Sequence, residues 1–295
     1  MENLTLFPED KAAVFKTAKS KYGVWPTTVW EIDYSKNLTK EIKRAIGDGG
    51  THRKGSNKNG YWTARRGCFQ TSIDNETCYR ITESIFNPQI CSIILNMYAP
   101  GQGICFDPFA GGGTRAILAA AHGLQYEGVE LRREEVDAII MRADNAGASG
   151  GIKIVCGDSR YLTDHFRDDY ADFLITCPPY WNLEKYEGGE SDLSMINDYG
   201  RFIDELGKVV AESGRILKPG ATACWVVGLH RQGGGAIAPL HHDLTRLHLA
   251  AGFDLREEII LSHKNNGAIQ RVGNFEKGNK LLIRTHEYCM VYTKR

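Results

Sequence analysis

The stretch Asp107-Pro-Phe-Ala-Gly-Gly-Gly-Thr114 joins a short apolar run to a segment of helical length. Gly111, Gly112 and Gly113 permit a tight turn and let main-chain amides approach a ligand closely, and the N-terminus of the following helix faces the same point. Turns of this kind also occur where nothing binds. By itself, the stretch therefore predicts a strand, a turn and a helix. It predicts a ligand only together with further residues elsewhere in the sequence.

Outward from this turn, apolar runs alternate with segments of helical length. The strand candidates are residues 103–109, 126–131, 152–158, 172–177, 221–227, 257–263 and 288–293. The helix candidates are residues 114–122, 134–146, 198–217 and 240–251. This alternation predicts an α/β fold with a mainly parallel sheet covered by helices. Residues 264–285 are too polar and too rich in glycine for a crossover helix, so we expect the last strand to be antiparallel.

Carboxylates follow the next two strand candidates. Glu130 lies about twenty residues beyond the glycine turn, where a carboxylate accepts hydrogen bonds from ribose hydroxyls in nucleotide-binding α/β folds. Asp158, followed by Ser159, is placed to bond an adenine amino group. The glycines are not followed by the Gly-Lys-Ser/Thr of phosphate-binding loops, and they lack the GxGxxG spacing of dinucleotide binders. Three strand ends that converge on one nucleoside favour S-adenosylmethionine (SAM) over ATP or NAD.

A second motif, Cys177-Pro178-Pro179-Tyr180, directly follows an apolar strand candidate, and ligands bind at such strand ends in open parallel sheets. The two prolines fix a rigid, extended loop, which is also the alternative interpretation if no ligand binds there. An amino nitrogen conjugated to a base ring is a poor nucleophile, so acceptors such as the Pro178 carbonyl would favour its attack on a methyl group. The Tyr180 ring offers a face on which an extruded base can stack.

At these residues the sequence resembles the amino-methylating DNA methyltransferases, which make N6-methyladenine or N4-methylcytosine and whose motifs read DPFAGSGT and (D/N/S)PP(Y/F/W). Residues 82–100 resemble the helix that precedes the cofactor loop in that family. Residues 23–29, 177–186, 225–228 and 280–292 resemble a subgroup carried by phages and mobile elements. The resemblance implies the Rossmann-like fold of SAM-dependent methyltransferases, with a seven-stranded sheet whose last strand is reversed.

The motifs and the resemblance together predict the site residues. The expected cofactor-binding residues are Phe86, Asn87, Asp107, Pro108, Phe109, Ala110, Gly111, Gly112, Gly113, Thr114, Glu130, Asp158 and Ser159. The expected catalytic residues are Cys177, Pro178, Pro179 and Tyr180, and the residues that either line the substrate pocket or pack beside it are Trp181 and Asn182.

Cys177 departs from the pattern, because the better-studied members of the family carry Asp, Asn or Ser at this position. Their side-chain oxygen accepts a hydrogen bond from the target amino group, whereas a thiol accepts only weakly. The target base therefore stays open between adenine N6, which we favour, and cytosine N4. The amino-group chemistry also leaves RNA or protein amide methylation and a non-catalytic partner subunit as further alternatives.

The formal net charge is zero, but basic residues are concentrated in two stretches. Nine basic residues face two acidic ones between Ser35 and Gly67, and a second basic stretch precedes the last strand candidate. Such stretches can neutralise DNA phosphates, although a solvated surface is the alternative. The expected DNA contacts are Arg53, Lys54, Arg65, Arg66, Arg271, Lys277, Lys280 and Arg284.

The remaining composition is that of a globular protein, with 42% hydrophobic residues. We expect a small N-terminal extension over residues 1–80, with a mobile loop at 47–60, and a catalytic domain over residues 81–295. No apolar run approaches the roughly 20 residues of a membrane span and no signal peptide precedes the domain, so we expect a cytoplasmic protein. The eight cysteines are scattered without CxxC pairs, which predicts free thiols and no metal site.

Overall fold

The computed structural model describes residues 21–22, 24, 26–33, 68–69, 81–82, 86–181, 183, 185–186, 188–231, 235–264 and 280–295. Within this part of the chain, an eight-stranded sheet has the order β1-β11-β12-β8-β7-β4-β5-β6. Its strands are β1 Val29–Asp33, β4 Gly103–Asp107, β5 Leu124–Glu130, β6 Ile152–Cys156, β7 Ala171–Thr176, β8 Leu217–Val227, β11 Phe253–Lys264 and β12 His286–Lys294.

The sheet has the predicted mixture of directions. β12 runs antiparallel to both of its neighbours, β11 and β8, whereas the other pairs of neighbouring strands are parallel. The predicted α/β fold with a mainly parallel sheet and a reversed last strand is therefore confirmed. The structure adds β1 to the seven predicted strands: Trp30 and Ile32 on this short strand are 1% and 0% exposed, and the strand pairs with the edge of β11.

The helices are α3 Pro88–Tyr98, α4 Thr114–Ala121, α5 Arg133–Asn145, α6 Tyr199–Ile216 and α7 Leu240–Ala250. The shorter elements are η1 Ser149–Gly151, η2 Gly189–Ser191, η3 Leu193–Met195 and the strand pairs β2 Cys68–Phe69 with β3 Ile81–Thr82 and β9 His230–Arg231 with β10 Ile237–Ala238. The last four helices agree with the predicted ranges to within one residue at each end.

The helix expected within residues 82–100 is shorter, because it begins only at Pro88. The side chain of Asn87 caps it by accepting hydrogen bonds from the main-chain amides of Gln89 and Ile90, at 2.8 and 3.4 Å. Proline suits the first position of a helix, since its missing amide hydrogen would have no partner there. Phe86 and Asn87 therefore lie just before the helix rather than within it.

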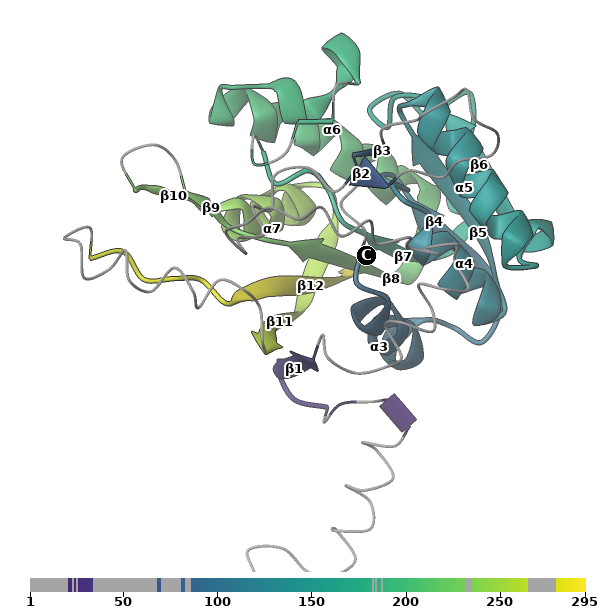
Figure 1. The fold of residues 1–295 in the computed structure, drawn as a ribbon, viewed down its shortest axis with the longest axis horizontal. Coiled ribbons are helices and arrows are strands. Elements are labelled where there is room, and N and C mark those ends of the chain that lie inside the picture. Colours follow the sequence, from purple (N-terminus) through teal and green to yellow (C-terminus); the bar gives the residue numbers. More distant parts are fainter. Residues whose placement is uncertain are drawn as a thin grey trace, which may run out of the picture.

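Helices cover the sheet on both faces (Figure 1). Residues of α6 and α7, such as Phe202 and Leu244, pack in one core cluster with Leu174 of β7. Residues of α3, α4 and α5 pack in a second cluster with Phe173, the neighbouring residue of the same strand. Successive strand residues face opposite sides of a sheet, so β7 contributes to both clusters and is apolar along its length.

Strand register brings the predicted site residues to one edge of the sheet. Asp107 at the end of β4 lies opposite Gly128 of β5, and Glu130 at the end of β5 lies opposite Cys156 of β6. Thr176 ends β7 directly before the Cys-Pro-Pro-Tyr motif. The carboxyl ends of four adjacent parallel strands therefore meet where open α/β sheets bind their ligands.

Candidate active site

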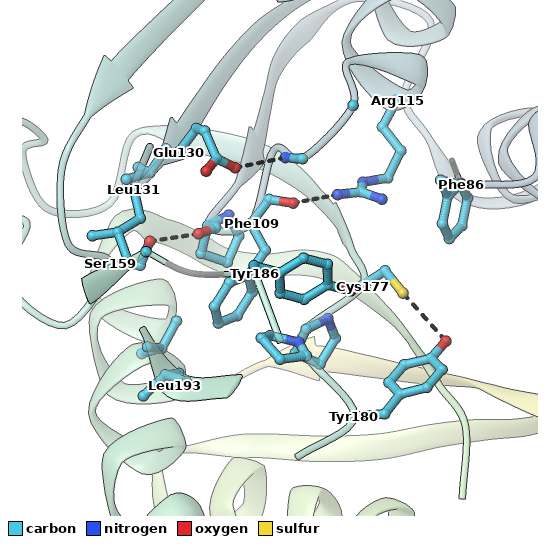
Figure 2. Close-up of a pocket in the computed structure, with 18 of the residues that line it drawn as sticks. Phe86, Phe109, Arg115, Glu130, Leu131, Ser159, Cys177, Tyr180, Tyr186 and Leu193 are labelled. Carbon is cyan, nitrogen blue, oxygen red and sulfur yellow. Dashed lines mark hydrogen bonds between the residues drawn. The ribbon is translucent and has the colours of Figure 1, made fainter. Parts of the chain in front are cut away.

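A cavity of about 400 Å³ opens at these strand ends, within the size range of ligand pockets (Figure 2). Many of the predicted site residues line it together. They are Phe86, Asn87, Pro108, Phe109, Gly111, Gly112, Glu130, Asp158, Ser159, Cys177, Pro178, Pro179 and Tyr180. The structure thus brings the glycine turn and the Cys-Pro-Pro-Tyr motif to a single cavity.

Four predicted cofactor residues are absent from the lining: Asp107, Ala110, Gly113 and Thr114. Asp107 is 0% exposed, and its carboxylate accepts hydrogen bonds from the Phe109 amide, the Thr176 and Tyr126 hydroxyls and the Arg115 guanidinium, at 2.6 to 2.9 Å. These donors belong to the turn, β7, β5 and α4. Asp107 therefore holds the glycine turn against β5 and β7 rather than facing a ligand.

The glycine turn is tied directly to Glu130. Gly111 and Gly113 have φ values of +53° and +79°, a left-handed conformation that favours glycine. The Gly111 amide donates to Glu130 Oε2 at 3.1 Å, and the Arg132 amide donates to Oε1 at 2.9 Å. Figure 2 shows the Glu130 carboxylate at the cavity wall beside Leu131. Glu130 also lines the cavity, and a carboxylate there can accept hydrogen bonds from ribose hydroxyls.

Asp158 lies on the same wall and is held by Arg160. The guanidinium of Arg160 donates to both carboxylate oxygens of Asp158, at 2.6 and 2.9 Å, and also to Glu205. Burial alone would raise the pKa of Asp158, but the hydrogen bonds from Arg160 outweigh it and hold the pKa below its ordinary value. Asp158 is thus ionised and, unlike Asp107, lines the cavity, where an amino group would share the carboxylate with Arg160, which donates four hydrogen bonds to it.

The opposite end of the cavity carries an unused donor. Asn87 Oδ1 caps α3, whereas the buried Nδ2 atom of Asn87 has no hydrogen-bond partner among the described residues. Beside it, the Arg115 guanidinium lies 4.8 Å from the centre of the Phe86 ring. Amide and guanidinium donors at one end and carboxylates at the other fit a ligand with an acid group at one end and a nucleoside at the other. SAM has this distribution of groups.

The Cys-Pro-Pro-Tyr motif forms a folded loop over the end of β7. Cys177 Sγ lies 3.3 Å from the Tyr180 hydroxyl, and a dashed line marks this contact in Figure 2. Burial raises the pKa of the Cys177 thiol to about 12 and raises that of Tyr180 well above its ordinary value. Both groups are therefore protonated at neutral pH, and neither is an ionised base.

Trp181, which the sequence placed either in the pocket or in the packing, is part of the packing. It is 6% exposed, is absent from the cavity lining, and contacts the rings of Tyr199 and His230 edge to face at 5.2 and 5.9 Å. Its φ of +58° lies in the left-handed region, which is uncommon for a residue with a side chain. Asn182 lies outside the described residues.

Sequence reasoning missed several residues that line the cavity: Arg115, Leu131, Tyr186, Leu193 and Glu287. Arg115 directly follows the predicted turn, and Tyr186 lies within a segment that the resemblance had singled out, so both had a local signal. Glu287 lies on the reversed strand β12, and 107 positions in the sequence separate it from Tyr180, which it contacts. Its segment, residues 280–292, was also singled out by the resemblance, but its contact with Tyr180 follows only from the strand order.

Two of the predicted DNA contacts are described. Lys280 is exposed, and Arg284 is half-buried and donates to the Leu229 carbonyl at 2.7 Å. The others lie outside the described residues: Arg53, Lys54, Arg65, Arg66, Arg271 and Lys277. None of the helices in the described part of the chain has the length and apolar character needed to cross a bilayer.

No protein-family model matches this sequence. A segment of 88 residues, 30% of this chain, is 30% identical to the type II methyltransferase M.BglII of Bacillus subtilis and spans 22% of that protein. Among solved structures, the [4+2]-cyclase SpnF has a TM-score of 0.52 at 16% identity, over 88% of this chain and 93% of its own. A SAM-dependent methyltransferase from Methanosarcina mazei has a TM-score of 0.47 at 15% identity, over 68% and 96%.

The chain has the Rossmann-like fold of the SAM-dependent methyltransferases. The distribution of donors and acceptors in the cavity fits SAM as the cofactor.

Proposed function

We propose that this protein is a DNA methyltransferase that transfers the methyl group of SAM to the exocyclic amino group of an extruded base, with adenine N6 favoured over cytosine N4. One observation carries the proposal: the Cys-Pro-Pro-Tyr loop and the glycine turn line the same cavity. An amino-group site placed beside a nucleoside site is the arrangement that this transfer requires.

In this proposal the cavity walls divide the cofactor between them. Glu130 accepts hydrogen bonds from the ribose, Asp158 accepts one from the adenine amino group, and Asn87 with Arg115 receives the carboxylate of the methionine end. The Gly111 and Gly112 backbone leaves room for close approach. Bound SAM supplies the electrophilic methyl group, and the protein supplies alignment, which converts a bimolecular encounter into a unimolecular step.

The Cys-Pro-Pro-Tyr loop holds the substrate in this proposal. The Pro178 carbonyl accepts a hydrogen bond from the amino group, and the Tyr180 ring stacks on the base. Because Cys177 and Tyr180 are both protonated at neutral pH, the reaction depends on hydrogen bonding and position rather than on an ionised general base. The basic stretches of the sequence provide contacts to the DNA phosphates.

The test is incubation of the protein with labelled SAM and unmethylated DNA, followed by digestion to nucleosides and mass spectrometry. We expect N6-methyladenine, whereas N4-methylcytosine would replace the favoured base with the alternative. Parallel incubations with tRNA, rRNA and protein extend the assay. Label that enters only these substrates would refute the DNA assignment, and failure to bind SAM would favour a non-catalytic subunit.

Two variants separate the two halves of the site. Tyr180→Ala should abolish most of the transfer while leaving SAM affinity within about twofold. Glu130→Ala should weaken SAM binding by roughly tenfold to a hundredfold, because a hydrogen bond to a charged group contributes about 1.5–3 kcal/mol. Isothermal titration with SAM measures both affinities. If Tyr180→Ala instead weakened SAM binding and Glu130→Ala left it unchanged, the proposed cofactor and base sites would be interchanged.

A further inference from the structure

Glu287 has an unexpected place beside the amino-group loop. It lies on β12, lines the cavity, and its Oε1 atom accepts a hydrogen bond from the Tyr180 hydroxyl at 3.3 Å. Its Oε2 atom lies 3.1 Å from Nε2 of His263, a residue of the neighbouring strand β11 that is almost fully buried. The reversed strand thus delivers a carboxylate to the loop whose own first residue, Cys177, has none.

These contacts fix the direction of a chain of hydrogen bonds. The Tyr180 hydroxyl has one hydrogen, and Glu287 accepts it. In the 3.3 Å contact between Tyr180 and Cys177, the thiol must therefore be the donor. The lone pairs of the sulfur are then directed away from Tyr180 and are available to a donor in the cavity. Hydrogen bonds that run in one direction polarise one another, so the carboxylate strengthens the sulfur as an acceptor.

We propose that Glu287 is a positioning residue that supplies, through Tyr180, the acceptor character that Cys177 lacks in the amino-group site. This inference rests on the proposed function, since the expected donor is the amino group of the substrate base. It explains how cysteine can occupy the position at which related motifs carry Asp, Asn or Ser. In this protein the carboxylate lies on another strand and acts through the side chains of Tyr180 and Cys177.

Glu287→Gln tests the inference, because it keeps the size of the side chain and removes its charge. Gln can still accept from Tyr180, so only the charge is lost, and we expect the rate of methyl transfer to fall roughly fivefold to tenfold, the difference between a charged and a neutral acceptor, with SAM affinity within about twofold. Glu257→Gln is the matched control, since Glu257 is an exposed carboxylate on the adjacent strand β11. It should transfer at the wild-type rate.

A double variant separates positioning from a purely structural role. Cys177→Asp combined with Glu287→Gln restores an acceptor directly at the loop, so it should transfer at least about tenfold faster than Glu287→Gln alone. Loss of packing or of the His263 contact would not be rescued in this way. The inference is wrong if Glu287→Gln is as active as Glu257→Gln, or if the double variant is no faster than Glu287→Gln.

Alkylation of Cys177 provides a readout that needs neither SAM nor DNA. Removing the Glu287 charge lowers the pKa of the Cys177 thiol, because the nearby carboxylate disfavours a thiolate. A decrease of one pKa unit raises the thiolate fraction about tenfold, but a less basic thiolate is a weaker nucleophile, so reaction with iodoacetamide becomes roughly threefold faster at a given pH. The rate for the Cys177 peptide is measured by mass spectrometry in the wild type, Glu287→Gln and Glu257→Gln.

This readout distinguishes failure of the inference from failure of the proposed function. If the wild type binds SAM but modifies no DNA, the function is refuted, and faster alkylation in Glu287→Gln still supports the coupling of Glu287 to Cys177. Equal alkylation rates in the wild type and both variants would overturn the inference whatever substrate the enzyme methylates.

Discussion

Besides its contacts with Cys177 and Glu287, Tyr180 packs against one glycine, Gly228, which directly follows β8. A Cβ atom at Gly228 would lie 2.6 and 2.8 Å from two carbon atoms of the ring, closer than carbon atoms can pack. The ring therefore packs closely against a backbone that has no side chain at this point. The glycine of the Trp-Val-Val-Gly segment thus has a role that its sequence context did not reveal.

We therefore expect Gly228→Ala to displace Tyr180 and to lower the rate of methyl transfer by roughly a hundredfold, the effect of a misplacement of about 1 Å in an active site. The affinity for SAM should remain within about twofold, because Glu130 and the glycine turn are untouched. Steady-state kinetics and titration with SAM measure the two quantities. Gly150→Ala is the control, since no atom lies within 4 Å of the position that its Cβ would take.

At the scale of the elements, β1 completes the sheet that supports the site. The strand pairs in parallel with β11, from Val29 opposite Ile260 to Asp33 opposite Lys264. The buried side chains of Trp30 and Ile32 join the same core cluster as α3 and α4. A segment that the sequence assigned to an N-terminal extension therefore packs with the elements that carry the glycine turn.

Trp30→Ala should decrease the free energy of unfolding by about 3–5 kcal/mol, because it removes a fully buried aromatic side chain and leaves a cavity. Urea unfolding followed by circular dichroism measures the change. Val29→Ala on the same strand is the control, since Val29 is 48% exposed and should change stability by less than about 0.5 kcal/mol. Equal stability of Trp30→Ala and the wild type would mean that β1 does not contribute to the folded domain.

For the whole molecule, the formal net charge is zero, so the chain as a whole has no net electrostatic attraction to DNA. We propose that the basic stretches carry the affinity for DNA, so binding should weaken as salt rises, whereas binding of the small cofactor should change little. Each phosphate contact contributes about 0.9 to the slope of log affinity against log salt concentration for duplex DNA.

Replacement of Arg53, Lys54, Arg65 and Arg66 by alanine should therefore reduce that slope by about 0.9 for each residue that contacts a phosphate. Fluorescence anisotropy with a labelled duplex over a series of salt concentrations measures the slope. A second set of four alanine substitutions, at the exposed residues Lys153, Arg167, Lys208 and Arg246, removes the same charge outside the two basic stretches. Equal slopes for both sets would show that the predicted segment has no special contact with DNA.

The sequence by itself determined the class of fold, the four main helices and the two motifs that meet at the cavity. It could do so because these features are local: glycine turns, apolar strands, helix lengths and a proline-rich loop each have a signal within a few residues. Asp107 shows the limit of such signals. Its position in the motif indicated a ligand contact, but its carboxylate accepts four hydrogen bonds, from donors on α4, β5, β7 and the turn.

Only the tertiary structure decided the place of Glu287, the fit of Tyr180 against Gly228 and the addition of β1 to the sheet. Each of these depends on which strands are neighbours and on their register, and the residues concerned are far apart in the chain. Strand order results from packing of the whole domain, so no short stretch of sequence encodes it. The acceptor that Cys177 lacks locally is therefore visible only once β12 is placed between β11 and β8.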